Sequence, residues 1–283
     1  MINLREVKEI FLSGGNIYGV SYVGALKSLN IYINLNKQII RWLGTSAGGI
    51  IAFLIVIGYT PNILEKIIPY IPYKEFNDFG LDDMIIFFET FGLNNGSKLQ
   101  HILEVFLTNR GFSKHITFKE LYDITGKEFA LLSFCLEDSK SVLLDFKNTP
   151  NLSVIQGVKM SSAVPFIFKP IEFNGKMYVD GFISDNTPSN FVKYPNNCLG
   201  LHVYPIVEYD NSKLDFFDFL RITFTGPMNE LDLIKYKKHS DRMMILRITK
   251  NMSYFFDVNS EDILSLIEIA YEQMQKQIKK IDS

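Results

Sequence analysis

The sequence has little of what marks disulfide-rich, metal-binding or nucleic-acid-binding proteins. It has only two cysteines, Cys135 and Cys198, and each lies in an apolar stretch without metal-ligand spacing. We therefore expect two buried free thiols, which fit a reducing compartment, and neither a disulfide nor a metal site built on the cysteines. Charged residues make up 21% of the chain and its net charge is −2, so the composition does not indicate a nucleic-acid partner.

The sequence also shows no segment that directs a protein into or across a membrane. Its first residues do not combine a basic start, a long apolar run and a small-residue cleavage site. The longest apolar run, Ile50–Ile57, is much shorter than the roughly 20 residues that a spanning helix needs. We therefore expect an intracellular, cytoplasmic protein that, if it meets a membrane, contacts it only peripherally.

What the chain does have is a large apolar fraction, arranged as alternating strands and helices. Hydrophobic residues make up 47% of the 283 residues, which is enough for a sizeable core. Helices are predicted at Gly19–Leu29 and from Ser46 to about Ile57, each after a strand and a glycine turn. This alternation predicts an α/β fold with a mostly parallel central sheet flanked by helices. The predicted strands are Val7–Leu12, Gln38–Leu43, Glu128–Leu136, Ser141–Phe146, Met177–Val179 and Cys198–Tyr204.

Helical patterns dominate two further parts of the chain. Residues 60–119 are predicted to form a helical insertion at the sheet edge, and Ser260–Ile281 an amphipathic helix that Ser260 caps. Segments 82–93 and 215–224 carry the apolar residues best suited to peripheral membrane contact, although their pattern favours core helices. Because no repeat or linker divides the chain, all 283 residues are predicted to form one domain.

The segment Gly44-Thr45-Ser46-Ala47-Gly48 matches the G-x-S-x-G pattern of a nucleophile elbow. In an elbow the serine lies on a strained turn between a strand and a helix, and bulky neighbours would clash there. The turn leaves the hydroxyl at a helix N-terminus, where partial positive charge stabilises an oxyanion. The pattern alone is weak, but here it follows a predicted strand and precedes a predicted helix. We therefore predict that Ser46 is a nucleophile.

The glycine loop, which we define as Ser13–Gly19, joins the first predicted strand to the first helix. Its glycines allow backbone N–H groups to point into a site, where they can hold a tetrahedral oxyanion. The same geometry can hold a phosphate, but the lysine of a Walker loop and the G-x-G-x-x-G spacing are both missing. An ordinary tight turn without a ligand is the other interpretation of this loop.

A serine nucleophile needs a base, and two kinds of residue compete for that role. Asp180 ends a short predicted strand before Gly181, where α/β enzymes gather their chemistry, and burial can raise its pKa. The alternative is an aspartate that caps its own turn. A Ser-His-Asp esterase would instead use His202 or His239, while His101 and His115 precede the acid in the chain.

Taken together and in this order, these pieces resemble the patatin-like phospholipase family from about Lys8 to Tyr194. The segments that carry the resemblance are SGGNIYGVSYVGALKSL, GTSAGG, TFKELYDITGKEFALLSF and KMSSAVPFIFKPIEFNGKMYVDGFISDNTPSN. The resemblance implies a patatin-like three-layer fold, in which Ser46 attacks an acyl carbonyl and Asp180 serves as its base without a histidine.

The resemblance also implies which groups surround the nucleophile and what they act on. Backbone N–H groups of the loop at Gly14, Gly15 and Asn16 would form the oxyanion hole, and Gly44 and Gly48 would shape the elbow. The substrates would be phospholipids or related acyl lipids, hydrolysed through an acyl-serine intermediate without a metal or other cofactor.

Three positions depart from the family pattern. Asn16 stands where a third glycine is usual, Tyr18 replaces a basic residue, and Phe182 replaces a small residue after Asp180-Gly181. Asparagine tolerates positive φ, so the loop conformation is expected to survive. The altered loop is nevertheless the feature that favours a second hypothesis, a lipid-binding or partner-binding module on the same fold.

Overall fold

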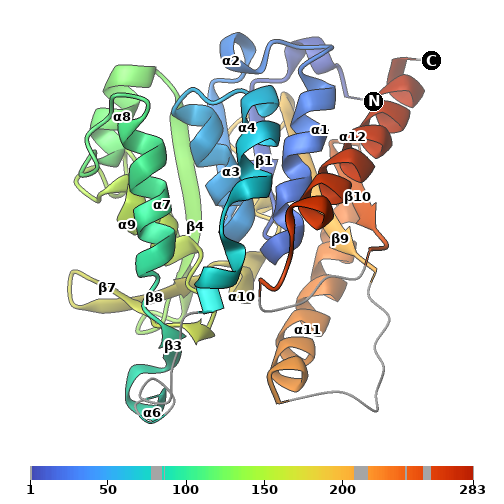
Figure 1. Cartoon of the computed structure of the whole chain (residues 1–283). Coiled ribbons are helices and arrows are strands. Elements are labelled where there is room, and N and C mark those ends of the chain that lie inside the picture. The colour runs from blue at the N-terminus through green and yellow to red at the C-terminus, as the bar shows by residue number, and fades with distance from the viewer. Residues whose placement is uncertain are drawn as a thin grey trace.

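A mostly parallel eight-stranded sheet runs through the centre of the molecule (Figure 1). The computed structural model describes residues 2–77, 85, 87–206, 216–239, 241–250 and 256–282. The strand order is β10-β9-β1-β2-β4-β8-β7, and β5 also pairs with β4. A separate small sheet pairs β3 with β6. The strands are β1 Glu9–Leu12, β2 Arg41–Thr45, β3 Gly92–Asn94, β4 Glu128–Cys135, β5 Lys140–Asp145, β6 Phe166–Phe168, β7 Ile171–Phe173, β8 Lys176–Asp180, β9 Cys198–Pro205 and β10 Met243–Ile248.

Helices flank this sheet, so the predicted α/β class is confirmed. Helix α3 follows β2 directly, and α1 packs along α12 beside it (Figure 1). Short 3₁₀ helices include Asn16–Val20, which begins in the glycine loop, and Tyr73–Asn77. The α-helices are α1 Ser21–Leu29, α2 Leu35–Gln38, α3 Ser46–Val56, α4 Pro61–Ile67, α6 Phe87–Thr90, α7 Ser97–Thr108, α8 Phe118–Thr125, α9 Val154–Ser161, α10 Phe182–Asp185, α11 Phe216–Lys238 and α12 Ser260–Asp282.

Each predicted strand corresponds to an observed one, with bounds that differ by three residues at most. The sequence analysis did not predict β3, β6, β7 and β10. The described part of segment 60–119 contains several helices, but it also contains β3, which pairs with β6, and an insertion at the sheet edge stays a prediction. Both cysteines are buried and free, as expected.

Strand β4 brings together the ends of two segments that are far apart in the sequence. Its residues 130–135 pair with β5 along one edge. On the other edge, Leu132 pairs with Thr45 of β2, and the next residue, Ser133, pairs with Asp180 of β8. Strand β8 therefore continues the edge where β2 stops, and Asp180 lies beside the turn that begins with Ser46.

The C-terminal helix α12 buries one stripe against the rest of the fold. Ile263, Ile267, Ala270, Met274 and Ile278 are all buried, as the helical spacing predicted. The predicted cap at Ser260 is wrong by one residue. Asn259 Oδ1 accepts the N–H of Asp262 at 2.9 Å, while the Asn259 N–H donates to the Asp262 carboxylate. This reciprocal pair makes Asn259 the capping residue.

The expectation of core helices in segments 82–93 and 215–224 is wrong for several of their large apolar side chains, although Leu93 is buried in β3. Phe88 is 84% exposed, Phe91 59% and Phe219 61%. Residues 82–84, 86 and 215 lie outside the described residues. Within the described part of the chain, no single helix is long and apolar enough to cross a membrane. One pair, Ser46–Val56 with Pro61–Tyr70, passes that test only jointly and is bent by 118°.

Candidate active site

Ser46 lies on a strained turn between β2 and α3. Its φ is 53°, in the left-handed region that L-residues rarely adopt, and its side chain is mostly buried. The turn is crowded on both sides. A Cβ atom at Gly48 would lie 2.4 Å from the carbonyl oxygen of Ser13, and one at Gly44 would lie 2.4 Å from the Cα of Gly49. Only glycine fits at these two positions, as the elbow pattern predicted.

The main chain of Ser46 is held in place by a serine from another helix. The Ser46 N–H donates to Ser161 Oγ at 3.1 Å, and the Ser161 hydroxyl donates to the carbonyl oxygen of Leu132 at 2.6 Å. Ser161 is fully buried at the end of α9. It therefore ties the elbow to β4, the strand that also positions Asp180. Sequence reasoning missed this support, because a serine in an apolar helix carries no local signal of its partner.

Asp180 is fully buried at the end of β8. Its Oδ1 accepts the N–H of Phe182 at 2.9 Å, while its Oδ2 has no hydrogen-bond partner among the described residues. Burial raises the pKa of Asp180 to about 7, although the Ser46 hydroxyl and the Phe182 N–H both act to lower it. The Ser46 hydroxyl thus lies close to the carboxyl group without completing a hydrogen bond to Oδ2. A carboxylate in this state suits a general base near neutral pH.

The glycine loop passes directly over the elbow. A Cβ atom at Gly14 would lie 3.3 Å from the Cβ of Ser46, and one at Gly19 would lie 2.5 Å from the Cβ of Ala47. Asn16 adopts a φ of 48°, so asparagine does sustain the positive φ expected of the usual glycine. The N–H of Gly14 donates to the carbonyl oxygen of Asn186 at 3.2 Å. Gly15 and Asn16 begin the following 3₁₀ helix, where N–H groups have no acceptor within the helix.

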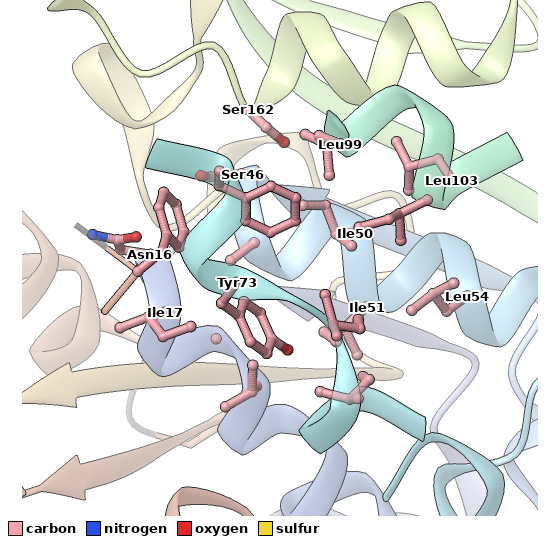
Figure 2. A pocket seen from close by; sticks show the side chains of 18 of the residues that line it. Asn16, Ile17, Ser46, Ile50, Ile51, Leu54, Tyr73, Leu99, Leu103 and Ser162 are labelled. Atoms are coloured by element: carbon pink, nitrogen blue, oxygen red, sulfur yellow. The ribbon is translucent and has the colours of Figure 1, made fainter. Parts of the chain in front are cut away.

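A cavity of about 900 Å³, counting the part open to solvent, reaches Ser46. Figure 2 shows Asn16 and Ile17 on one side of Ser46 and Leu99 and Leu103 on the other. The side chains that line it are apolar except for Asn16, Ser46, Ser162 and the Tyr73 hydroxyl. Such a lining suits a hydrocarbon chain and offers few groups to a polar ligand. The other lining residues are Ile17, Gly19, Val20, Ala47, Ile50, Ile51, Leu54, Ile68, Ile71, Phe76, Leu99, Ile102, Leu103, Phe106, Val164, Phe168 and Phe256.

The model of patatin-like phospholipases matches residues 10–191, which include the elbow, the glycine loop and Asp180. The chain belongs to the patatin-like phospholipase family. It is 34% identical to the probable lipid hydrolase 463L of Invertebrate iridescent virus 6 over 195 residues, 68% of this chain and 66% of that protein. It is also 27% identical to protein R571 of Acanthamoeba polyphaga mimivirus, over 99% of this chain and 96% of the other.

The fold of this patatin-like chain also matches solved structures. VipD from Legionella pneumophila superposes with a TM-score of 0.61, at 15% identity, over 97% of this chain and 67% of that one. At 15% sequence identity, the similarity to VipD shows a shared fold and no more. The chain spans only about two thirds of the length of VipD and of the iridescent-virus relative.

None of the four histidines of this patatin-like chain, all of which the structure describes, is placed to act as the base of a Ser-His-Asp triad. Among the described residues, no hydrogen bond joins Ser46 to a histidine. His202 is buried, and its Nδ1 contacts Ser13 Oγ at 2.8 Å and Thr187 Oγ1 at 3.2 Å. His239 directly follows the last residue of α11, and His101 and His115 are exposed. The Ser-His-Asp hypothesis therefore has no geometric support in this structure.

Two further departures from the family pattern can now be placed. Tyr18 is buried within the glycine loop rather than reaching solvent as an arginine would. Phe182 follows Asp180-Gly181 and is not among the residues that line the cavity, so it does not narrow that space.

Proposed function

We propose that the protein is a serine acyl hydrolase that cleaves acyl esters of phospholipids or related lipids. One observation carries the proposal: the strained Ser46 hydroxyl lies beside the buried carboxyl of Asp180, at the polar end of an apolar cavity. The description of the iridescent-virus relative as a probable lipid hydrolase supports the same reaction class.

In this mechanism, Asp180 accepts the proton of the Ser46 hydroxyl as the oxygen attacks the ester carbonyl. The tetrahedral oxyanion is stabilised by N–H groups of Gly15 and Asn16 and by the N-terminus of α3. Gly14 shapes the loop, because its own N–H is bonded to Asn186. Collapse of the intermediate expels the alcohol, which takes the proton from Asp180. Water then releases the fatty acid from the acyl-serine by the reverse sequence of proton transfers.

The first experiment measures fatty acid released from mixed phospholipid vesicles by the wild type and by Ser46→Ala. We expect the variant to fall to background, a loss on the order of 10⁴-fold or more, because the nucleophile is gone. A fluorophosphonate probe should label the wild type and not the variant. Ser28→Ala is the matched control, since Ser28 is buried on α1 and its hydroxyl has no partner among the described residues.

The control should behave like the wild type in both assays. If the wild type releases no fatty acid and the probe leaves Ser46 unmodified, the hydrolase proposal is wrong. A lipid-binding or partner-binding module would then take its place.

The cavity predicts a limit on acyl-chain length. Ile50, Ile51 and Leu54 line it along α3 (Figure 2). Leu54 lies about 12 Å beyond Ser46 along the helix axis, at 1.5 Å per residue. Leu54→Phe should shorten the cavity and lower kcat/KM for long-chain p-nitrophenyl esters by about tenfold or more. The acetyl ester, which does not reach that depth, should be hydrolysed within about twofold of the wild-type rate.

Phe53→Leu on the same helix separates this effect from general disturbance of the core. Phe53 packs against Phe129 at 6.1 Å between ring centroids and does not line the cavity. Its variant should leave the ratio of long-chain to short-chain activity unchanged. Equal losses for long and short esters in Leu54→Phe would contradict an acyl chain in this cavity.

A further inference from the structure

A partly buried hydrogen-bond chain connects the glycine loop to α11, which lies beyond the family-matched residues 10–191. The N–H of Gly14 donates to the carbonyl oxygen of Asn186 at 3.2 Å. The side-chain amide of the same Asn186 donates to Asp232 Oδ2 at 2.7 Å. Asp232 is only 2% exposed, although carboxylates are rarely buried without a purpose. A single asparagine therefore joins the loop over Ser46 to a buried carboxylate on a distant helix.

The chemistry of the carboxylate decides how the Asn186 side chain must lie. The Asp232 oxygen acts as the acceptor, so the NH₂ group of Asn186, which is the donor, faces Asp232. The amide oxygen Oδ1 then faces Gly14, where it lies 2.3 Å from the position that a Cβ atom would occupy. Asp232 thereby fixes the rotamer of the side chain that packs on the glycine loop, and burial strengthens that control.

His202 forms a second bridge between the glycine loop and the segment that contains Asn186. Its Nδ1 lies between Ser13, just before Gly14, and Thr187, just after Asn186. Its Nε2 lies 4.0 Å from Asp232 Oδ2. Tyr22 completes this group, because its hydroxyl contacts Ser13 Oγ at 2.7 Å. The loop is thus held by a connected polar network rather than by one isolated bond.

We propose that Asp232 is a positioning residue, which acts through Asn186 to hold the glycine loop over Ser46. The inference rests on the proposed function for its effect on catalysis, but the anchoring itself is a property of the loop. Because the N–H of Gly14 is held by Asn186, the next N–H groups of the loop stay directed toward the site. The segment beyond residue 191 therefore completes the active site from outside the family match.

The test exchanges the two side chains that form the hydrogen bond. Asn186→Asp places two carboxylates against each other and removes the donor. Asp232→Asn keeps an acceptor but no longer enforces the orientation of Asn186. The double variant Asn186→Asp with Asp232→Asn restores one donor facing one carboxylate, and it keeps an oxygen over Gly14. Glu230→Gln, an exposed carboxylate on the same helix, is the matched control.

Two measurements follow each variant at pH 8. The first is kcat and KM for a short-chain p-nitrophenyl ester, with the titratable fraction of Ser46 counted by a fluorophosphonate. We expect Asn186→Asp to lower kcat by about 10- to 100-fold with little change in KM, because a displaced loop stabilises the oxyanion less. In Asp232→Asn, kcat should fall less. In the double variant, kcat should recover to within about fivefold of the wild-type value, and in Glu230→Gln it should not change.

The second measurement is hydrogen exchange of the peptide that contains Gly14, which does not depend on catalysis. Exchange should rise in Asn186→Asp and return toward the wild-type rate in the double variant. A double variant no better than Asn186→Asp in either assay would overturn the proposal, and so would single variants indistinguishable from the wild type. If the wild type hydrolyses no ester but the exchange follows this pattern, the hydrolase proposal fails while the anchoring stands.

Discussion

Asp180→Asn is expected to lower the rate at which Ser46 is acylated by about 10²- to 10⁴-fold, the contribution typical of a general base. Asparagine has the shape of aspartate but cannot accept the serine proton. In the wild type the carboxyl has a pKa of about 7, so kcat/KM should rise with pH and level off above about pH 7. Single-turnover acylation by a p-nitrophenyl ester, measured from pH 5 to pH 9, provides the test.

The same substitution should make the folded protein more stable above neutral pH. Burial raises the pKa of Asp180 from 3.8 to about 7 in the folded state. Between these pH values the unfolded chain releases its proton and the folded chain keeps it, so the stability of the wild type decreases as pH rises. Asparagine has no proton to release. At pH 8 the variant should therefore be more stable by on the order of 2–4 kcal/mol, and below about pH 4 the two should differ little.

Urea denaturation of both proteins at pH 4, 6 and 8 measures this difference, with Asp123→Asn as the control. Asp123 is exposed on α8 and pairs with Lys119 at the surface, so its loss should change stability little at any pH. A stability difference between the wild type and Asp180→Asn that does not grow with pH would show that the Asp180 carboxyl titrates near its ordinary value. A base with an ordinary pKa would also leave kcat/KM flat between pH 5 and pH 9.

The local parts of this site could be predicted from the sequence because they are carried by short segments. The elbow around Ser46 and the strand end at Asp180 each combine an apolar run with glycines at fixed positions. The placement of the elbow next to the end of β8 is not carried by a short segment. It depends on β4, which pairs with Thr45 through Leu132 and with Asp180 through Ser133. Register between distant strands has no local signal, so the resemblance to a family was needed to join the two residues.

The missed features share a physical reason. β6 and β7 are three residues each, too short for an alternating pattern to stand out. β10 begins with an apolar run of four residues, Met243–Leu246, and such short runs do not distinguish a strand from a buried helix segment. The bond between Asn186 and Asp232 spans two elements whose packing is decided only in three dimensions. Single polar residues in such a network look like ordinary surface residues in the sequence.

Gly24→Ala is expected to destabilise the protein by about 3 kcal/mol or more, although alanine is the better helix former. Gly24 lies inside α1, where helix propensity alone predicts a gain of up to about 1 kcal/mol from the substitution. A Cβ atom there would lie 1.8 Å from the carbonyl oxygen of Ile267 in α12 and 3.0 Å from the Tyr271 nitrogen. Both are backbone atoms, so no side chain can rotate away, and α12 would have to move from its position along α1 (Figure 1).

Helix propensity predicts that Gly24→Ala raises stability, whereas the clash with α12 predicts that it lowers stability. The sign of the measured change therefore tests the packing of α1 on α12. Thermal and urea unfolding should both show the loss, with Ser28→Ala, one turn further along the same buried helix, as the control. Ser28 has no hydrogen-bond partner among the described residues, so its variant should be as stable as the wild type or more so. A Gly24→Ala protein more stable than the wild type would mean that α12 does not approach α1 this closely. The cavity should remain intact in that case, because neither Gly24 nor any residue of α12 lines it.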